Sequence, residues 1–175
     1  MFLDNYYKIL GMYFMYRFDG VSLTLPNGTS ANAYYYNANT ASHNLCLDNL
    51  QTLSTSYSSV GVIFGDGTTP PTHTDYCLSG DVVTGIVASS TRKATGTDDA
   101  AENTVLFTIT NNNAKAVTIG EVGYVGYINF YTGPTGSGTN SDRLLLDRTL
   151  LESPITIDPG GVGQITYTLR MNYPT

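Results

Sequence analysis

The C-terminal part of the chain alternates between apolar and polar side chains, which is the pattern of antiparallel strands. Between residues 164 and 171 every second residue is apolar, namely Ile165, Tyr167, Leu169 and Met171. Thr166, Thr168 and Arg170 lie between them, and Val105, Phe107 and Ile109 repeat the pattern earlier in the chain. Because successive side chains of a strand point to opposite faces, each run buries one face and exposes the other. Antiparallel sheets commonly do this, whereas parallel sheets rarely do.

Composition agrees with a single β-rich domain. The 175 residues fall within the usual size of one domain. Only 13% of them are charged, against about 25% in typical globular chains. The 18 glycines suit tight turns, and the 14 tyrosines suit strands and interfaces.

The charge and the apolar runs limit the possible partners. A net charge of −6 argues against direct binding to nucleic acid, which needs clustered basic residues. The chain has no apolar run of about 18 residues, so no membrane contact is expected. The first 18 residues lack the basic start and the cleavage site of a signal peptide. We therefore expect Cys46 and Cys77 to be reduced thiols.

Residues 1–18 form an apolar, tyrosine-rich N-terminal arm that precedes the domain. Apolar residues occupy both strand faces here, and Phe2, Tyr6, Ile9 and Tyr13 also fit helical spacing. The segment is a doubly buried strand, a short helix, or an arm that docks on a neighbouring subunit. In the last case the interface residues are Tyr6, Tyr7, Tyr13, Phe14 and Tyr16.

Residues 19–175 are expected to form one β-sandwich domain. Strands are predicted at 21–25, 31–40, 60–64, 82–88, 105–110, 116–131, 144–151, 153–157 and after 161, with a short helix at 45–53 and a polar connection at 89–102. The strands at 105–110 and 116–131 read as a hairpin, with a bulge near Gly120. The predicted fold is an all-β, antiparallel two-sheet sandwich, of jelly-roll or immunoglobulin-like type, with an N-terminal extension.

One set of residues has metal-ligand chemistry. His43 and Cys46, and again His73 and Cys77, are spaced closely enough to chelate, and together they could close a tetrahedral zinc site. Both cysteines sit beside leucines and tyrosine, where small buried hydrophobes are common. We expect no metal and no cofactor, although the sequence leaves the zinc alternative open.

The sequence contains no recognisable catalytic motif. It has only two histidines and no Gly-x-Ser-x-Gly elbow, and nothing marks Glu121 and Glu152 as a paired acid and base. Glu121 falls inside a predicted strand, which indicates an inward ion pair or hydrogen bond. A non-enzymatic role is therefore expected.

Three segments resemble structural proteins of tailed bacteriophages. Residues 62–76 resemble a "G-x-G-T-T-P-P-x-x-x-D" segment, residues 107–123 an "F-T-x-T-N-N … I-T-I-x-E-x-G" segment, and residues 145–168 an "L-x-R-x-x-x-x-S-P-I-T-I-x-P-G … I-T-Y-T" ending. The resemblance spans residues 60–173. It implies a virion component, such as a decoration protein, the base of a head or tail fibre, or a neck or tail accessory protein.

The expected function is therefore that of a virion structural protein, assembled in the host cytoplasm. It would form homo-oligomers and dock on other virion proteins by burying apolar and tyrosine surface and by pairing edge strands. The alternative is a carbohydrate-binding module of a receptor-binding fibre, with Tyr34, Tyr35 and Tyr36 stacking on sugars. A cell-wall hydrolase, which needs two juxtaposed carboxylates in a cleft, is the third possibility.

Overall fold

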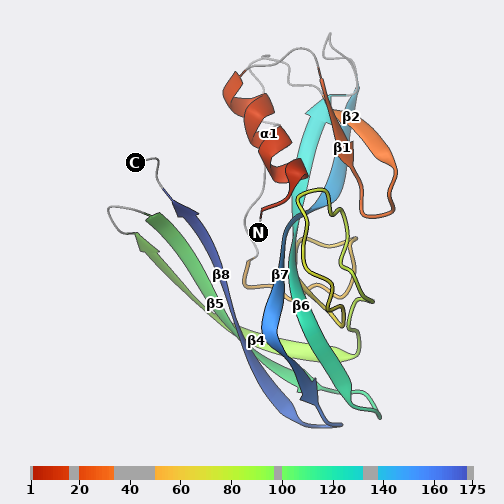
Figure 1. Ribbon diagram of the computed structural model, residues 1–175, viewed down its shortest axis with the longest axis vertical. Coiled ribbons are helices and arrows are strands. Elements are labelled where there is room, and N and C mark those ends of the chain that lie inside the picture. Colours follow the sequence, from red (N-terminus) through yellow and green to blue (C-terminus); the bar gives the residue numbers. More distant parts are fainter. Residues whose placement is uncertain (1, 16–19, 34–49, 97–99, 132–137, 173–175) are drawn as a thin grey trace.

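The computed structural model describes residues 2–15, 20–33, 50–96, 100–131 and 138–172 (Figure 1). The described part contains one helix and eight strands. Their bounds are α1 Asp4–Met15, β1 Val21–Thr24, β2 Ser30–Ala33, β3 Gly61–Gly65, β4 Ile86–Gly96, β5 Ala100–Asn111, β6 Val117–Tyr131, β7 Thr139–Ile157 and β8 Val162–Asn172.

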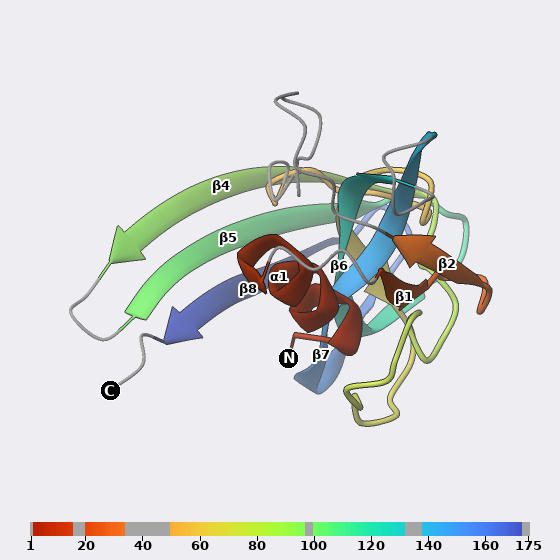
Figure 2. The same cartoon turned by 90° about the horizontal axis from the view of Figure 1, so that it is seen from above.

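All strands pair antiparallel, in three sheets. One sheet has the order β3-β6-β7, a second has the order β4-β5-β8, and β1 and β2 form a separate ribbon. In Figures 1 and 2 the β4-β5-β8 sheet extends away from β6 and β7, with the end of β8 at its far end. The prediction of an all-β, antiparallel chain is confirmed.

The main core lies between the two three-stranded sheets. It includes the alternating apolar residues that the sequence pattern identified on β5 and β8, which are Val105, Phe107, Ile109, Ile165, Tyr167 and Leu169. They share one cluster with residues of the other sheet, and the rings of Phe64 and Phe107 meet edge to face at 5.5 Å. Burial of these inner faces is the main force that holds the sheets together.

The N-terminal segment is helical, as one of its three alternatives predicted. Leu3 and Ile9 are fully buried, and Tyr6 joins the main core. The side chain of Asn5 clamps β1, because its amide donates to Thr24 O at 2.6 Å and its oxygen accepts from Thr24 N at 3.0 Å. The first turns of α1 are therefore fixed to the domain by both apolar and polar contacts.

The predicted hairpin between residues 105–110 and 116–131 is wrong. β5 pairs with β4 and β8, whereas β6 pairs with β3 and β7, so the chain crosses between sheets at this turn. Asn111 explains the crossing. Its buried amide donates to Lys115 O at 2.9 Å and to Ile157 O at 2.8 Å, while its backbone pairs with Gly160 and Gly161. The end of β5 is thereby tied to the β7–β8 turn.

Two further predictions need correction. The polar connection at 89–102 is largely strand, because β4 and β5 pair continuously from Ile86–Asn111 to Gly96–Ala101. Backbone pairing continues there although few apolar side chains mark it. The two strands expected at 144–151 and 153–157 are one strand, β7, and Pro154 is tolerated because β7 lies at a sheet edge.

Other local predictions have mixed outcomes. The bulge at Gly120 is confirmed by a register shift between Ile119 and Glu121. Residues 50–53 form a turn and a bridge instead of the end of a helix. The rest of that expected helix, and the strand expected after Ala33, lie outside the described residues.

Candidate functional site

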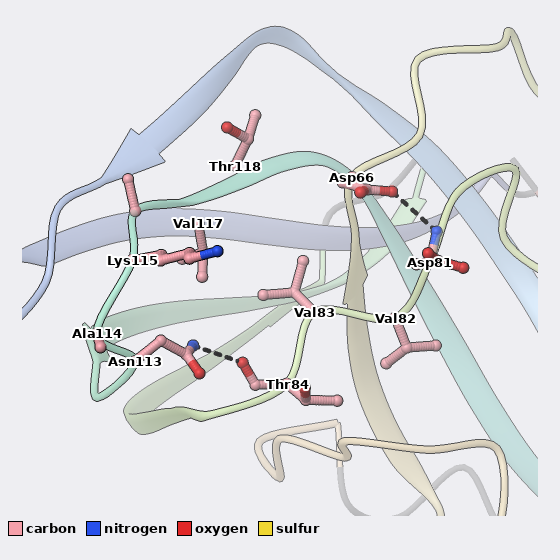
Figure 3. Close-up of a pocket in the computed structure, with 11 residues that line it drawn as sticks. Asp66, Asp81, Val82, Val83, Thr84, Asn113, Ala114, Lys115, Val117 and Thr118 are labelled. Carbon is pink, nitrogen blue, oxygen red and sulfur yellow. Dashed lines mark hydrogen bonds between the residues drawn. The ribbon is translucent and has the colours of Figure 1, made fainter.

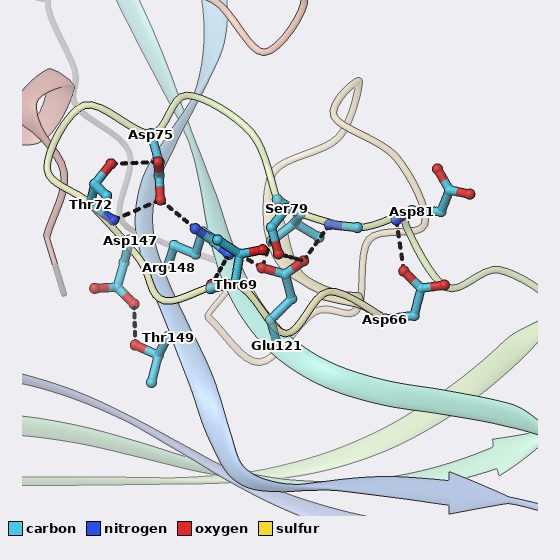
Figure 4. A network of polar contacts seen from close by, with 12 residues as sticks. Asp66, Thr69, Thr72, Asp75, Ser79, Asp81, Glu121, Asp147, Arg148 and Thr149 are labelled. Atoms are coloured by element: carbon cyan, nitrogen blue, oxygen red, sulfur yellow. Dashed lines mark hydrogen bonds and ion pairs between the residues drawn. The ribbon is translucent and has the colours of Figure 1, made fainter.

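The most organised polar site in the described part of the chain is centred on Arg148 of β7 (Figure 4). Its side chain is only 2% exposed, and that of its partner Glu121 on β6 is fully buried. Arg148 Nε donates to Glu121 Oε2 at 2.6 Å, and Nη2 donates to Thr69 O at 2.6 Å. Nη1 donates to Asp75 Oδ2. One guanidinium thus joins two carboxylates and a backbone carbonyl.

Glu121 also anchors the loop that follows β3. Its Oε1 accepts from Gly80 N at 2.8 Å and from Ser79 Oγ at 3.2 Å, and its Oε2 accepts from Ser79 N at 3.2 Å. These bonds satisfy a carboxylate that would otherwise be costly to bury. The loop between residues 66 and 81 is therefore fixed against β6 and β7 through Glu121 and Arg148.

The electrostatics of the site favour the charged forms. Burial opposes ionisation of Asp75, but hydrogen bonds from Thr72 and the Arg148 guanidinium outweigh it and lower the pKa of Asp75 below its usual value. Burial likewise disfavours the Arg148 cation, yet Glu121 and Asp75 raise the pKa of Arg148 above its usual value. The arrangement holds the loop in place through fixed opposite charges.

This network joins the three segments on which the resemblance rests. Asp75 ends the first segment, Glu121 belongs to the second, and Arg148 is the arginine of the third. The inward ion pair predicted for Glu121 is confirmed. Its partner Arg148 was not identified from the sequence, because the β6–β7 register that brings the two residues together is a tertiary feature.

A recess of about 640 Å³ opens beside this loop, where the start of β6 approaches the segment before β4 (Figure 3). Asp66 and Asp81 lie at one end of the recess, and Lys115 and Asn113 lie toward the other. Asp66 Oδ1 accepts from Asp81 N at 2.8 Å. The recess offers hydrogen bonds to a polar ligand, but its lining holds no aromatic ring on which a sugar could stack.

The outer face of the β4-β5-β8 sheet presents a different kind of surface. Three of the exposed large hydrophobic side chains, Val87, Leu106 and Val162, lie on this face. The remaining positions are mostly threonine, including Thr104 and Thr168, whose hydroxyl groups are 3.1 Å apart. Such a face carries few charges and is suited to contact with another protein.

The structure separates the tyrosines predicted for an interface. Tyr6 is 3% exposed and belongs to the core, whereas Tyr7 is 54% exposed. Tyr13 and Phe14 lie on α1, but the structure does not describe their side chains. Tyr16 and the glycan candidates Tyr34, Tyr35 and Tyr36 lie outside the described residues. The docking role of α1 stays a prediction.

The zinc alternative also stays untested, because His43 and Cys46 lie outside the described residues. His73 is exposed and Cys77 is half-buried. Burial, with help from Asp75, raises the pKa of the Cys77 thiol above its usual value, so it is less readily ionised. Within the described ranges, no three His, Cys, Asp or Glu side chains gather closely enough to hold a metal ion.

Among the described residues, α1 is too short to cross a membrane, and no other helix is present there. Neither a protein-family model, nor a curated protein, nor a solved structure matches the chain.

Proposed function

We propose that this chain is a non-enzymatic structural protein of a tailed-bacteriophage virion, which self-associates and docks on other virion proteins. Its two three-stranded sheets would form the layers of an antiparallel sandwich, with α1 covering one end. The proposal rests on the resemblance of residues 60–173 and on the surfaces that the fold leaves available for assembly.

The observation that carries the proposal is the pair of long outer edges on the β4-β5-β8 sheet. β4 and β8 are each 11 residues long and lie at the two edges. No described strand pairs with the outer side of either one. Long edges with unpaired backbone groups are a hazard in a free monomer, but in an assembly they are binding surfaces.

The Arg148 network supports the same role. It uses buried charge to hold a long loop in one conformation, through contacts at Thr69, Asp75, Ser79 and Gly80. A loop held in this way has a fixed shape, and a fixed shape lowers the entropic cost of docking. Rigid surface loops are useful to a protein whose task is to fit against neighbours.

Mass spectrometry and cryo-EM of purified virions from the phage that encodes the chain would test this proposal. We expect the chain in a fixed copy number per particle, with density on the head, neck, tail or fibre. Absence of the chain from purified virions would contradict the proposal. A virion protein of known copy number from the same preparation serves as the internal control.

A further inference from the structure

We infer that β8 is the self-association edge, and that it pairs antiparallel with β8 of a second copy. This inference rests on the proposed function and names the strand through which self-association occurs. The two sheets would then join into one continuous six-stranded sheet, β4-β5-β8 followed by the partner's three strands.

The two outer edges differ in how well they are protected. β4 carries Arg92 and Lys93 near its middle, and Ser90 Oγ donates to Gln51 O at 2.6 Å. Basic side chains on an edge strand discourage pairing, because a second copy would bring like charges together. β8 carries a single charge, Arg170, near its end, and Glu102 already pairs with it at 3.1 Å. β8 is therefore the edge that is less protected against pairing with another strand.

A groove of about 340 Å³ runs beside the first half of β8. It is lined by Gln164, Ile165 and Thr166 on one side and by residues 151–153 and 155 of β7 on the other. Ile165 belongs to the inner face of the sheet, and its two neighbours belong to the outer face. Because both faces contribute, the groove lies along the edge of β8 and separates the first half of that edge from β7.

The sequence of β8 is self-complementary in this arrangement. In a symmetric antiparallel pair, opposed residues share a face, and the full length of Val162–Asn172 pairs when Tyr167 lies on the two-fold axis. Thr166 then lies opposite the partner copy's Thr168. Ile165, which is apolar and inward, lies opposite the partner copy's Leu169. The inner apolar stripe thus continues across the junction.

Charge complementarity favours the same register. It places Arg170 of the second copy opposite Gln164, in the groove whose only charged lining residue is Glu152. The same contact occurs a second time through the two-fold axis. Arg170, which already pairs with Glu102 of its own chain, would then also lie near Glu152 of the other copy and away from the other copy's Arg170.

Analytical ultracentrifugation of the full chain over a range of concentrations tests the inference. Wild type should dimerise. The double variant Thr166→Lys/Thr168→Lys places lysine opposite lysine twice, and should weaken the dimer about tenfold or more. Both residues are exposed, so circular dichroism should show an unchanged fold. The matched control Ser89→Lys/Thr91→Lys adds the same charge at exposed positions of β4 and should dimerise as wild type does.

Two mixing experiments make the test specific for β8. Adding a Thr166→Glu/Thr168→Glu chain to the lysine variant should restore a heterodimer, because each lysine then faces a glutamate. In a Cys46→Ser/Cys77→Ser background, a mixture of Thr166→Cys and Thr168→Cys chains should form a disulfide-linked heterodimer under oxidation. A Thr91→Cys chain mixed with either of these chains should not form a disulfide-linked heterodimer.

A wild-type chain that stays monomeric, or a lysine variant that dimerises as wild type does, would overturn the inference. The inference would also be overturned if the β8 amides became protected from hydrogen exchange only when a different virion protein was added. In each of these cases, presence of the chain in purified virions would leave the proposed function standing. Absence from virions would contradict the proposed function whatever the dimer does.

Discussion

At the residue scale, Arg148 shows how one buried cation can organise a loop. It lies between β6 and the segment after β3, and it forms ion pairs with both Glu121 and Asp75. Burying such a group is expensive unless each charge has a partner and each donor an acceptor. The ion pairs therefore serve mainly to define where the loop lies, and they make the site sensitive to loss of any one member.

The variant Arg148→Met should destabilise the chain by about 3–5 kcal/mol, because Glu121 would remain buried without its cation. Urea unfolding followed by circular dichroism measures the change. Arg170→Met is the matched control. It breaks a solvent-exposed pair with Glu102, so it should cost less than about 1 kcal/mol. If the two variants lowered the free energy of unfolding equally, the Arg148 network would contribute no more stability than a surface ion pair.

Asp75 should make the stability of the folded chain depend on pH. Its pKa is lower in the folded chain than the usual 3.8, so between the two values the unfolded chain binds more protons. The stabilisation is complete above the unfolded-state pKa and is lost as the pH falls through the folded-state pKa. Asp75→Asn should therefore be less stable than wild type at neutral pH, and the gap should narrow below about pH 4. A gap that is constant with pH would contradict this account.

At the element scale, the sequence predicted strands better than it predicted their partners. Alternation on β5 and β8 depends on one buried face, which is a local consequence of strand geometry, so the inner residues were correctly identified. The Asn111–Asn113 turn gave the right position for a reversal, but turn chemistry does not say whether the flanking strands pair. That choice depends on Asn111 reaching the distant Ile157 and Gly161, which no local pattern reveals.

The same limit applies to the site. Glu121 stands out as a carboxylate inside an apolar strand, so an inward partner could be expected from the sequence. Arg148 does not stand out, because its neighbours Asp147 and Thr149 are also polar. The polar runs of β4 lack the apolar alternation that marks β5, since residues 91–95 of β4 are exposed on both faces of the sheet. Pattern analysis therefore misses strands where burial is slight.

Gly120 marks the bulge because another part of the backbone passes close to it. A Cβ at this position would lie 2.4 Å from Gly67 O, so the loop would have to move. Gly120→Ala should destabilise the chain by about 1–3 kcal/mol. Hydrogen exchange should become faster in the loop between residues 66 and 81. Thr118→Ala, at an exposed position of the same strand, should change stability by less than about 0.5 kcal/mol. Unchanged exchange in the loop would contradict the role given to Gly120.

At the scale of the whole molecule, α1 is attached to the domain and also presents surface to solvent. The two roles fall on neighbouring residues. Tyr6 stacks on Phe2 with ring centroids 4.1 Å apart and is buried, whereas Tyr7 is exposed. Removal of residues 1–18 would disturb both roles, so a truncated chain cannot tell core packing from docking. Single substitutions can separate the two.

Tyr6→Ala should lower the free energy of unfolding by about 3–5 kcal/mol, because it removes a buried ring from the core. Tyr7→Ser should change stability by less than about 0.5 kcal/mol. If α1 docks on another virion protein, the Tyr7→Ser chain should fold normally yet enter virions at reduced copy number, as measured by quantitative mass spectrometry. Tyr76→Ser, at an exposed tyrosine of the loop after β3, is the control and should enter virions normally. Full incorporation of the Tyr7→Ser chain would leave α1 as a core element, and assembly would then have to use the sheet edges.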